Sequence, residues 1–298
     1  MRRQPVSRPT RRPARPPVRP PVRTAVRRRL LVLVPLLLLA ACTSGPDRDG
    51  EGEDRPDDLS PAPAPGERWL PAPGVSWQWQ LTGKLDTSVK AAVYDIDGFT
   101  TTKEQVAELN AAGRRTICYL STGAWEDFRP DAAAFPASMR GTGNGWEGER
   151  WLDIRRLTEL EPLIAKRFDM CRDKGFDAVE PDNMDAYRNR SGFPLTAGDQ
   201  LKYNRLIARL AHDRGLSVGL KNDLDQIPEL VGDFDFAVNE QCAQYDECGR
   251  LTPFIAAGKA VFHVEYELPA SRFCAASREL KLSSLEKKYD LGVWRKAC

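Results

Sequence analysis

A repeated succession of helix, glycine and strand is the feature that most restricts the folds open to this chain. Helical patterns end at a glycine, and an apolar, strand-like run begins within two residues of it, at Gly113, Gly175, Gly215 and Gly258. Glycine is favoured there because it adopts the left-handed conformation that ends many helices. Regular alternation of strands and helices indicates a parallel sheet with right-handed crossover connections.

The number of apolar runs predicts a closed barrel rather than an open sheet. Strand-like runs occupy residues 75–81, 91–97, 115–121, 176–182, 216–221, 234–240 and 260–266, and an eighth begins at 282–285. Helical patterns occupy residues 102–112, 160–174, 197–214, 226–231, 251–257 and 273–281, and residues 124–150 are expected to form a long loop. Eight strands in about 230 residues predict a single-domain α/β protein, a (β/α)₈ TIM barrel. A dinucleotide-binding sheet is disfavoured because no Gly-x-Gly-x-x-Gly motif follows the first strand.

Residues 1–41 have the composition of a signal peptide with a basic, proline-rich beginning. Residues 1–29 contain eleven arginines and no acidic residue, and an apolar run of twelve residues follows at 30–41. A run of that length fits a signal-peptide core of roughly 7–15 residues and is shorter than a membrane span of about 20. The residues Leu39-Ala40-Ala41-Cys42 resemble a bacterial lipobox. We therefore expect lipidation of Cys42, and an ordinary signal peptide is the alternative.

The predicted processing divides the chain and changes its charge. Residues 42–66 are expected to form the lipidated N-terminus and an acidic, disordered linker, and residues 67–298 the barrel domain. Without the eleven N-terminal arginines, 33 basic residues remain against 42 acidic ones, a net charge of −9. An acidic mature protein disfavours a nucleic-acid partner and favours a cationic or neutral ligand. We expect an exported protein, either lipid-anchored to the outer face of the cell membrane or extracellular.

Six cysteines remain besides Cys42, an even number that suggests disulfides in an exported protein. Cys242–Cys248 is the simplest pairing because it closes a short loop, and Cys118–Cys171 and Cys274–Cys298 would then follow. Buried free thiols are the alternative. A zinc site is disfavoured because the chain has no Cys-x-x-Cys motif and only two histidines.

Polar residues collect at the carboxyl ends of the predicted strands, which converge on one face of a barrel. Burying a charged group on an apolar strand costs several kcal/mol unless it is paired. One such residue is explained by a structural ion pair, but a succession of them indicates a functional site. The residues are Asp95, Asp97, Tyr119, Ser121, Glu180, Asp182, Lys221, Asn222, Glu240, His263 and Glu265.

The predominance of carboxylates in this set indicates glycoside hydrolysis. Two carboxyl groups cleave a glycosidic bond, one protonating the leaving oxygen while the other attacks the sugar or activates water. This chemistry needs no metal or other cofactor, so none is expected. Aromatic side chains in the same loops stack on sugar rings or, alternatively, pack the loops on the barrel; they are Trp125, Trp146, Trp151, Tyr187 and Tyr266.

Two motifs together resemble glycoside hydrolase family 114, the endo-α-1,4-polygalactosaminidases and spherulin-4-like proteins. They are Glu180-Pro181-Asp182-Asn183-Met184-Asp185 with Tyr187, and Asn239-Glu240-Gln241-Cys242. The segments Tyr94-Asp95-Ile96-Asp97, Cys118 to Gly123 and Gly219-Leu220-Lys221-Asn222 add to a resemblance that covers residues 69–298.

The resemblance implies a barrel that cleaves an α-1,4-linked galactosamine polymer. It places the nucleophile on Asp182 and the acid/base on Glu240. An acidic cleft would attract such a cationic aminosugar polysaccharide. We expect a retaining, endo-acting monomer whose only membrane contact is the lipid anchor. The residues expected to bind substrate are Asp95, Asp97, Tyr119, Trp125, Glu180, Asn183, Asp185, Tyr187, Lys221, Asn222, His263 and Glu265.

Two other functions fit the same residues. A non-catalytic polysaccharide-binding lipoprotein would use the aromatic side chains and the acidic field without a working carboxylate pair. A metal-dependent barrel enzyme would bind Mg²⁺ or Ca²⁺ through Glu180, Asp182 and Asp185.

Overall fold

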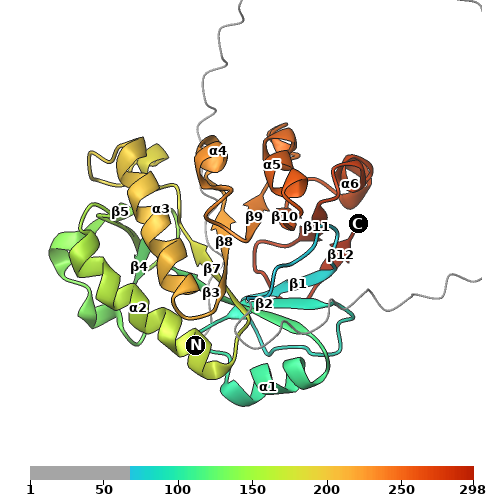
Figure 1. Cartoon of the computed structure of the whole chain (residues 1–298), viewed down its shortest axis with the longest axis horizontal. Helices are drawn as coiled ribbons and strands as arrows, with labels where there is room; N and C mark the ends of the chain where they lie inside the picture. Colours follow the sequence, from blue (N-terminus) through green and yellow to red (C-terminus); the bar gives the residue numbers. More distant parts are fainter. Residues whose placement is uncertain (1–67) are drawn as a thin grey trace, which may run out of the picture. The chain divides into compact units, whose positions relative to one another are not determined.

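Eight parallel strands form a nearly closed barrel in the computed structural model of the chain, which describes residues 68–298 (Figure 1). The indole Nε1 of Trp77 in the first strand donates to the carbonyl of Ser283 in the last (2.8 Å), which brings the two edges together. In sheet order the strands are β1 (Trp77–Gln80), β2 (Val93–Asp97), β3 (Arg115–Ser121), β7 (Ala178–Asp182), β8 (Ser217–Lys221), β9 (Phe236–Glu240), β10 (Val261–Glu265) and β11 (Ser283–Lys287). The predicted barrel is confirmed. The predicted signal peptide, Cys42 and the predicted linker all lie outside the described residues.

Six helices surround the strands, as Figure 1 shows: α1 (Lys103–Ala111), α2 (Leu157–Lys174), α3 (Ala197–His212), α4 (Ile227–Leu230), α5 (Thr252–Ala256) and α6 (Ala270–Glu279). Within residues 68–298 no helix joins β1 to β2, and an antiparallel strand, β12 (Arg295–Ala297), follows β11 in place of a helix. None of the helices described is long and apolar enough to cross a membrane.

Local sequence signals set the ends of the main helices. Thr102 and Thr196 cap α1 and α3, each accepting a hydrogen bond from the backbone three residues later. This capping satisfies amide groups that the first helical turn leaves without partners. The four glycines of the repeated pattern all have positive φ, between 72° and 90°. The helix–glycine–strand pattern therefore identified real helix ends.

Residues 124–150, predicted as a loop, contain a small sheet of their own. The strands β4 (Ala124–Glu126), β6 (Glu149–Leu152) and β5 (Arg140–Gly143) pair antiparallel in that order. The prediction was wrong because these strands have only three or four residues, too few to show an alternating pattern.

Two apolar clusters separate the inside of the barrel from its outside. One contains Trp77, Trp79, Phe236, Phe262 and Val264 and draws on strands but on no helix, so it fills the barrel interior. The other packs the outer faces of the strands against the helices. Because side chains alternate along a strand, every second residue faces the interior.

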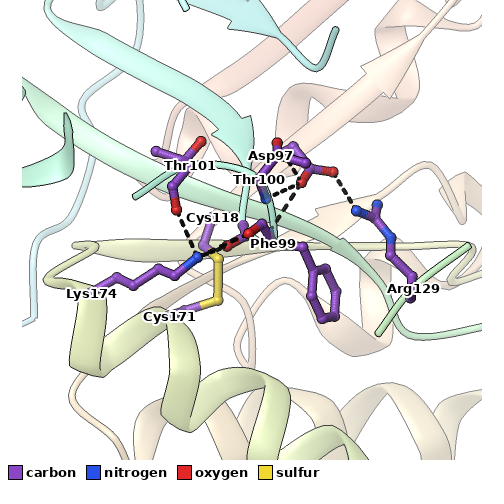
Figure 2. Close-up of a disulfide and its surroundings, with 9 residues drawn as sticks. Asp97, Phe99, Thr100, Thr101, Cys118, Arg129, Cys171 and Lys174 are labelled. Carbon is purple, nitrogen blue, oxygen red and sulfur yellow. Dashed lines mark hydrogen bonds and ion pairs between the residues drawn. A yellow bond between two sulfur atoms is a disulfide. The ribbon is translucent and has the colours of Figure 1, made fainter. Parts of the chain in front are cut away.

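All three predicted disulfides are present: Cys118–Cys171, Cys242–Cys248 and Cys274–Cys298. Figure 2 shows the first of them, which joins β3 to α2. Beside it Lys174 Nζ donates to the carbonyls of Gly98, Phe99 and Thr101, and so attaches α2 to the turn after β2. A cross-link that closes a loop of this length is worth about 4 kcal/mol. Disulfides are typical of exported proteins.

Candidate active site

Three neighbouring strands deliver three charged side chains to one point at the carboxyl face of the barrel. Asp182 ends β7, Lys221 ends β8 and Glu240 ends β9. The strands lie in that order in the sheet, so the lysine stands between the two acids. Each of the three side chains lies on the same face of the sheet as an apolar side chain of the barrel interior, either on its own strand or in register on a paired strand. All three side chains therefore point into the mouth of the barrel.

Lys221 is the centre of this arrangement. Its Nζ lies 2.7 Å from Glu180 Oε1, 3.3 Å from Asp182 Oδ1 and 3.5 Å from Glu240 Oε2. The lysine side chain is only 2% exposed, whereas those of Asp182 and Glu240 are 21% and 27% exposed. Burial lowers the pKa of Lys221, but the charges of the surrounding carboxylates outweigh it and hold that pKa well above its usual range. Lys221 is a buried permanent cation that two accessible acids share.

Asp182 is held through both of its oxygens. Tyr119 Oη donates to Oδ2 (2.7 Å), and the backbone amide of Asn183 donates to Oδ1 (2.8 Å). Burial and the charge of Asp182 raise the pKa of Tyr119 well above its usual range, so the phenol stays a neutral donor. Donors aimed at a carboxylate stabilise its ionised form. Tyr119, expected to bind substrate, instead positions Asp182.

Glu240 is held in a matching way from the other side. Tyr266 Oη donates to Oε1 (2.5 Å) and Asn222 Nδ2 to Oε2 (3.3 Å), while Asn222 Oδ1 accepts from the Glu240 amide (3.0 Å). Burial and the charge of Glu240 raise the pKa of Tyr266 well above its usual range. Asn222 therefore fixes both the backbone and the side chain of Glu240.

Asp95 and Glu180 lie below the two exposed acids and are fully buried. Burial, and then the charge of Glu180, raise the pKa of Asp95 well above its usual range. Glu180 in turn accepts from Lys221. Asp95 and Glu180, predicted to contact substrate, expose no surface in this structure and lie beneath Lys221.

The residue after each of these three strands has a left-handed backbone: Asn183 (φ 65°), Asn222 (φ 53°) and Gln241 (φ 65°). A positive φ is uncommon for residues other than glycine and costs of order 1–3 kcal/mol. Here it turns the chain sharply after the functional residue, and the next side chain hydrogen-bonds another segment: Asn183 contacts Ser121, Asn222 contacts Glu240 and Gln241 contacts Gln244. Backbone strain of this kind concentrates at functional sites.

Four other predicted residues make contacts outside the cluster of Asp182, Lys221 and Glu240. Asp97 accepts from the amides of Phe99 and Thr100 and pairs with Arg129 (2.7 Å), so it holds the turn after β2 (Figure 2). Trp125 donates its indole N–H to the carbonyl of Ala132 and stacks under Arg140. Both side chains, predicted to bind substrate, are engaged in these contacts within the protein.

His263 and Glu265 lie on the outer face of β10 and are fully buried. His263 packs edge-on against Phe273 of α6 and contacts Glu265 Oε1 through Nε2 (2.9 Å). Glu265 accepts from the amide of Ala243 (2.7 Å) and so holds the loop that follows Glu240. His263 and Glu265, predicted to contact substrate, thus lie on the opposite face of the strand from Phe262 and Val264, which face the barrel interior.

The small sheet supplies residues that sequence reasoning missed. Asn144 Nδ2 donates to Glu149 Oε2 (2.7 Å) and approaches Asn183 Oδ1 (3.5 Å), which joins this sheet to the end of β7. Burial and the charges of Glu126 and Asp182 raise the pKa of Glu149 to about 7. No sequence signal pointed to Glu149, because its place beside Asp182 depends on the pairing of β6.

Asp223, Asp185 and Tyr187 form the wall beyond β8. Asp223 is 2% exposed and accepts from Asn204 Nδ2 (2.9 Å), while Asp185 and Tyr187 are half-buried beside it. Burial and the charges of Asp185 and Asp225 raise the pKa of Asp223 to about 8. The expectation that Asp185 and Tyr187 bind substrate remains a prediction.

We expect Asp223→Asn to stabilise the protein at pH 8 and to leave its stability near pH 4 unchanged. The folded-state pKa of Asp223 exceeds the unfolded value of about 3.9, so the wild type loses stability as pH rises from about 4 to about 8. The gain at pH 8 should be at least about 1 kcal/mol, since one pKa unit is worth 1.36 kcal/mol. Asparagine tolerates the left-handed backbone at this position (φ 41°).

Thermal unfolding at the two pH values measures this effect. Asp225→Asn is the matched control, because Asp225 pairs with Arg188 and Arg250 and its pKa is lowered. The control should lose stability at pH 8. A difference between Asp223→Asn and wild type that did not change with pH would contradict the assignment.

A parallel barrel with two partly exposed acids on either side of a buried ammonium has the features of a glycoside hydrolase. The chain belongs to glycoside-hydrolase family GH114, whose family model matches residues 59–298. The protein is thus a glycoside hydrolase.

Two solved structures resemble the chain, the first in sequence and fold and the second in fold alone. The crystal structure of Aspergillus fumigatus Ega3 in complex with galactosamine is 40% identical, covers 78% of this chain and 98% of its own, and superposes with a TM-score of 0.74. The glycoside hydrolase domain of PelA from Pseudomonas aeruginosa is 16% identical, covers 74% of this chain and 98% of its own, and has a TM-score of 0.59, which shows a shared fold. No curated protein matches the chain in sequence.

Proposed function

We propose that the protein hydrolyses an α-1,4-linked, galactosamine-containing polysaccharide, with Asp182 as nucleophile and Glu240 as general acid and base. The observation that carries the proposal is the contact of both acids with one buried lysine, at 3.3 and 3.5 Å. The galactosamine bound to Ega3, a relative of 40% identity, supports the choice of sugar. The net charge of −9 without the N-terminal arginines suits a polymer that carries ammonium groups.

The separation of the two acids favours a retaining mechanism. Because the contacts of 3.3 and 3.5 Å share the Lys221 nitrogen, the two carboxylate oxygens lie within about 7 Å of each other. Retaining glycosidases hold their carboxyl groups about 5–5.5 Å apart, and inverting enzymes need roughly 6.5–9.5 Å to admit water. An upper limit of about 7 Å on the distance between these oxygens includes the whole retaining range but only the smallest separations of the inverting range.

In the first step an oxygen of Asp182 attacks the anomeric carbon while Glu240 gives its proton to the leaving oxygen. The glycosidic bond breaks and a glycosyl–Asp182 ester forms. In the second step Glu240 removes a proton from water, which attacks the same carbon and releases Asp182. Tyr119 and Lys221 stabilise the carboxylate that leaves, and Asn222 with Tyr266 keeps Glu240 directed at the bond.

The position of Lys221 argues against the metal-dependent alternative. A divalent ion bound by Glu180 and Asp182 would have to occupy the space between their carboxylates, and the Lys221 ammonium already fills it at 2.7 and 3.3 Å. Two cations so close would repel each other strongly in a buried site.

Product analysis on defined α-1,4-linked galactosamine oligomers tests the proposal. We expect internal cleavage to shorter oligomers, with the α-anomer as the first product seen by NMR. Binding of the oligomers without cleavage would instead favour a polysaccharide-binding lipoprotein. Activity that a chelator abolishes and a divalent ion restores would favour a metal enzyme.

Glu240→Gln is expected to lower kcat on an oligomer by about 10²–10⁴-fold, the usual contribution of a general acid or base. With an aryl glycoside that has a good leaving group, the first step no longer needs the proton. We therefore expect a burst of released phenol followed by slow turnover, which added azide should accelerate. If no burst is seen and kcat falls equally on the oligomer and the aryl glycoside, Glu240 is excluded as the acid/base.

We propose further that the mature protein begins at a lipidated Cys42 and acts as a monomer, with the acidic linker of residues 42–66 between the anchor and the barrel. The three disulfides agree with export from the cytoplasm. Mass spectrometry of the N-terminal peptide and of the intact protein tests both points.

A further inference from the structure

Exposed aromatic side chains gather on the Glu240 side of the cleft, in loops that the proposed chemistry does not use. In the described part of the chain the large exposed apolar side chains include Tyr245, Tyr289, Val293 and Trp294. The first lies in the loop after β9, and the other three lie in the connection from β11 to β12. Apolar surface concentrated in this way marks binding sites more often than chance exposure does.

Tyr289 is connected to the active site through one intermediate ring. Its ring stacks on that of Tyr266, with centroids 4.4 Å apart and planes at 19°, and Tyr266 donates to Glu240 at 2.5 Å. Gln241 Nε2, directly after Glu240, approaches the Tyr289 hydroxyl (3.4 Å). Nearly half of the Tyr289 side chain is nevertheless exposed, at 48%.

The β11–β12 connection is held in place before any ligand binds. The amides of Leu81 and Thr82 both donate to the carbonyl of Leu291 (2.9 and 3.3 Å), and Lys287 Nζ donates to the carbonyl of Gly292 (2.6 Å). Lys287 is 1% exposed, and burial lowers its pKa to about 8. A preorganised loop loses little conformational entropy on binding.

The charge beside Tyr289 fits a cationic sugar. Burial and the charge of Glu267, an exposed residue, raise the pKa of Tyr289. An aromatic face next to an exposed carboxylate attracts an ammonium group through both the ring and the charge. The sheet order β9-β10-β11 places Tyr266 and Tyr289 on the opposite side of Glu240 from Asp182. That is the side on which an acid that protonates the leaving oxygen meets the departing sugar.

We propose that Tyr289, with Tyr266, Tyr245 and Glu267, forms a binding subsite for an aminosugar unit of the leaving half of the polymer. This inference rests on the proposed hydrolysis, because it defines the leaving side by the role of Glu240. The subsite binds the polymer on the leaving-group side of the scissile bond, and it makes long chains better substrates than short ones.

Tyr289→Ala tests the subsite in the full-length enzyme. The quantity compared is kcat/KM for a galactosamine hexamer divided by kcat/KM for an aryl galactosaminide, whose leaving group is not a sugar. We expect this ratio to fall about tenfold, chiefly through KM, and Tyr289→Trp to restore it. Trp294→Ala is the matched control, because Trp294 lies in the same connection with similar exposure but stacks on Lys288. Its ratio should equal that of wild type.

Two results would overturn the subsite. An equal loss on both substrates would show that Tyr289 only supports Tyr266 and Glu240, and an unchanged ratio would show that no sugar binds there. Calorimetry measures the affinity for the hexamer in Asp182→Asn and in the double variant Asp182→Asn with Tyr289→Ala. This tests sugar binding at the subsite separately from catalysis. Binding weakened about tenfold by Tyr289→Ala, together with no cleavage of the hexamer by the wild-type protein, would retain the subsite and reject the hydrolysis. Equal affinity in the two variants would reject the subsite.

Discussion

Asp182→Asn is expected to reduce kcat on galactosamine oligomers by roughly 10⁴-fold or more, the scale seen when a covalent catalyst is removed. The amide has nearly the shape of the carboxylate, so the contacts with Tyr119 and with the Asn183 amide can largely persist. What is lost is the negative charge and the nucleophilic oxygen. Steady-state kinetics on oligomers, with the oligomer affinity measured in parallel, separates loss of chemistry from loss of binding.

Asp185→Asn is the matched control for this variant. Asp185 follows the same strand and is half-buried, but it has no place in the proposed bond-making steps. We expect it to change KM by severalfold and kcat far less. Near-normal kcat for Asp182→Asn would remove Asp182 from the mechanism and direct attention to the other exposed acid, Glu240.

Lys221→Met is expected to destabilise the fold at pH 7 by about 3–5 kcal/mol, the usual cost of removing one partner from a buried ion pair. Methionine fills a similar volume, so the loss is electrostatic: Glu180 would stay buried beside Asp95 with no cation. The pKa of Glu180 is already raised by burial, and it would rise further. The destabilisation should therefore be largest at neutral pH and fade toward about pH 4, where an unfolded Glu is protonated as well.

A double variant separates the structural role of Lys221 from its role in the site. Lys221→Met with Glu180→Gln removes both members of the buried pair and should recover most of the stability. Activity should not recover, because Asp182 and Glu240 still lack the cation they share. Urea unfolding at pH 4 and pH 7, combined with oligomer kinetics, measures both effects. Full stability of Lys221→Met at pH 7 would contradict the assignment.

The barrel could be predicted from sequence because its signals are local and repeated. Thr102 caps a helix, and Gly175 ends one, through contacts within a few residues. The small sheet of residues 124–152 was missed because its strands are short and pair through contacts far from any local pattern. Because that sheet was not predicted, the sequence pattern did not indicate that Glu149 and Asn144 lie beside the end of β7.

The candidate site was predicted well on some strands and poorly on others, and alternation along the strand explains the difference. On β7, Glu180 and Asp182 share the interior face, so the exposed acid and its buried neighbour were both found. On β10, His263 and Glu265 face the helices, and the next interior position is Tyr266. Both faces of a barrel strand are buried, so polarity alone does not tell inside from outside.

The sequence by itself determined the eight strands of the barrel, the glycines that end the main helices and the strand ends at which acidic residues gather. These depend on local conformation and on the chemistry of single residues. Only the tertiary structure decided that Lys221 stands between Asp182 and Glu240, that Asp95 and Glu180 are fully buried, and that Tyr289 stacks on Tyr266. Those arrangements depend on which side chains from distant strands meet across the barrel mouth, where burial sets the charge of each group.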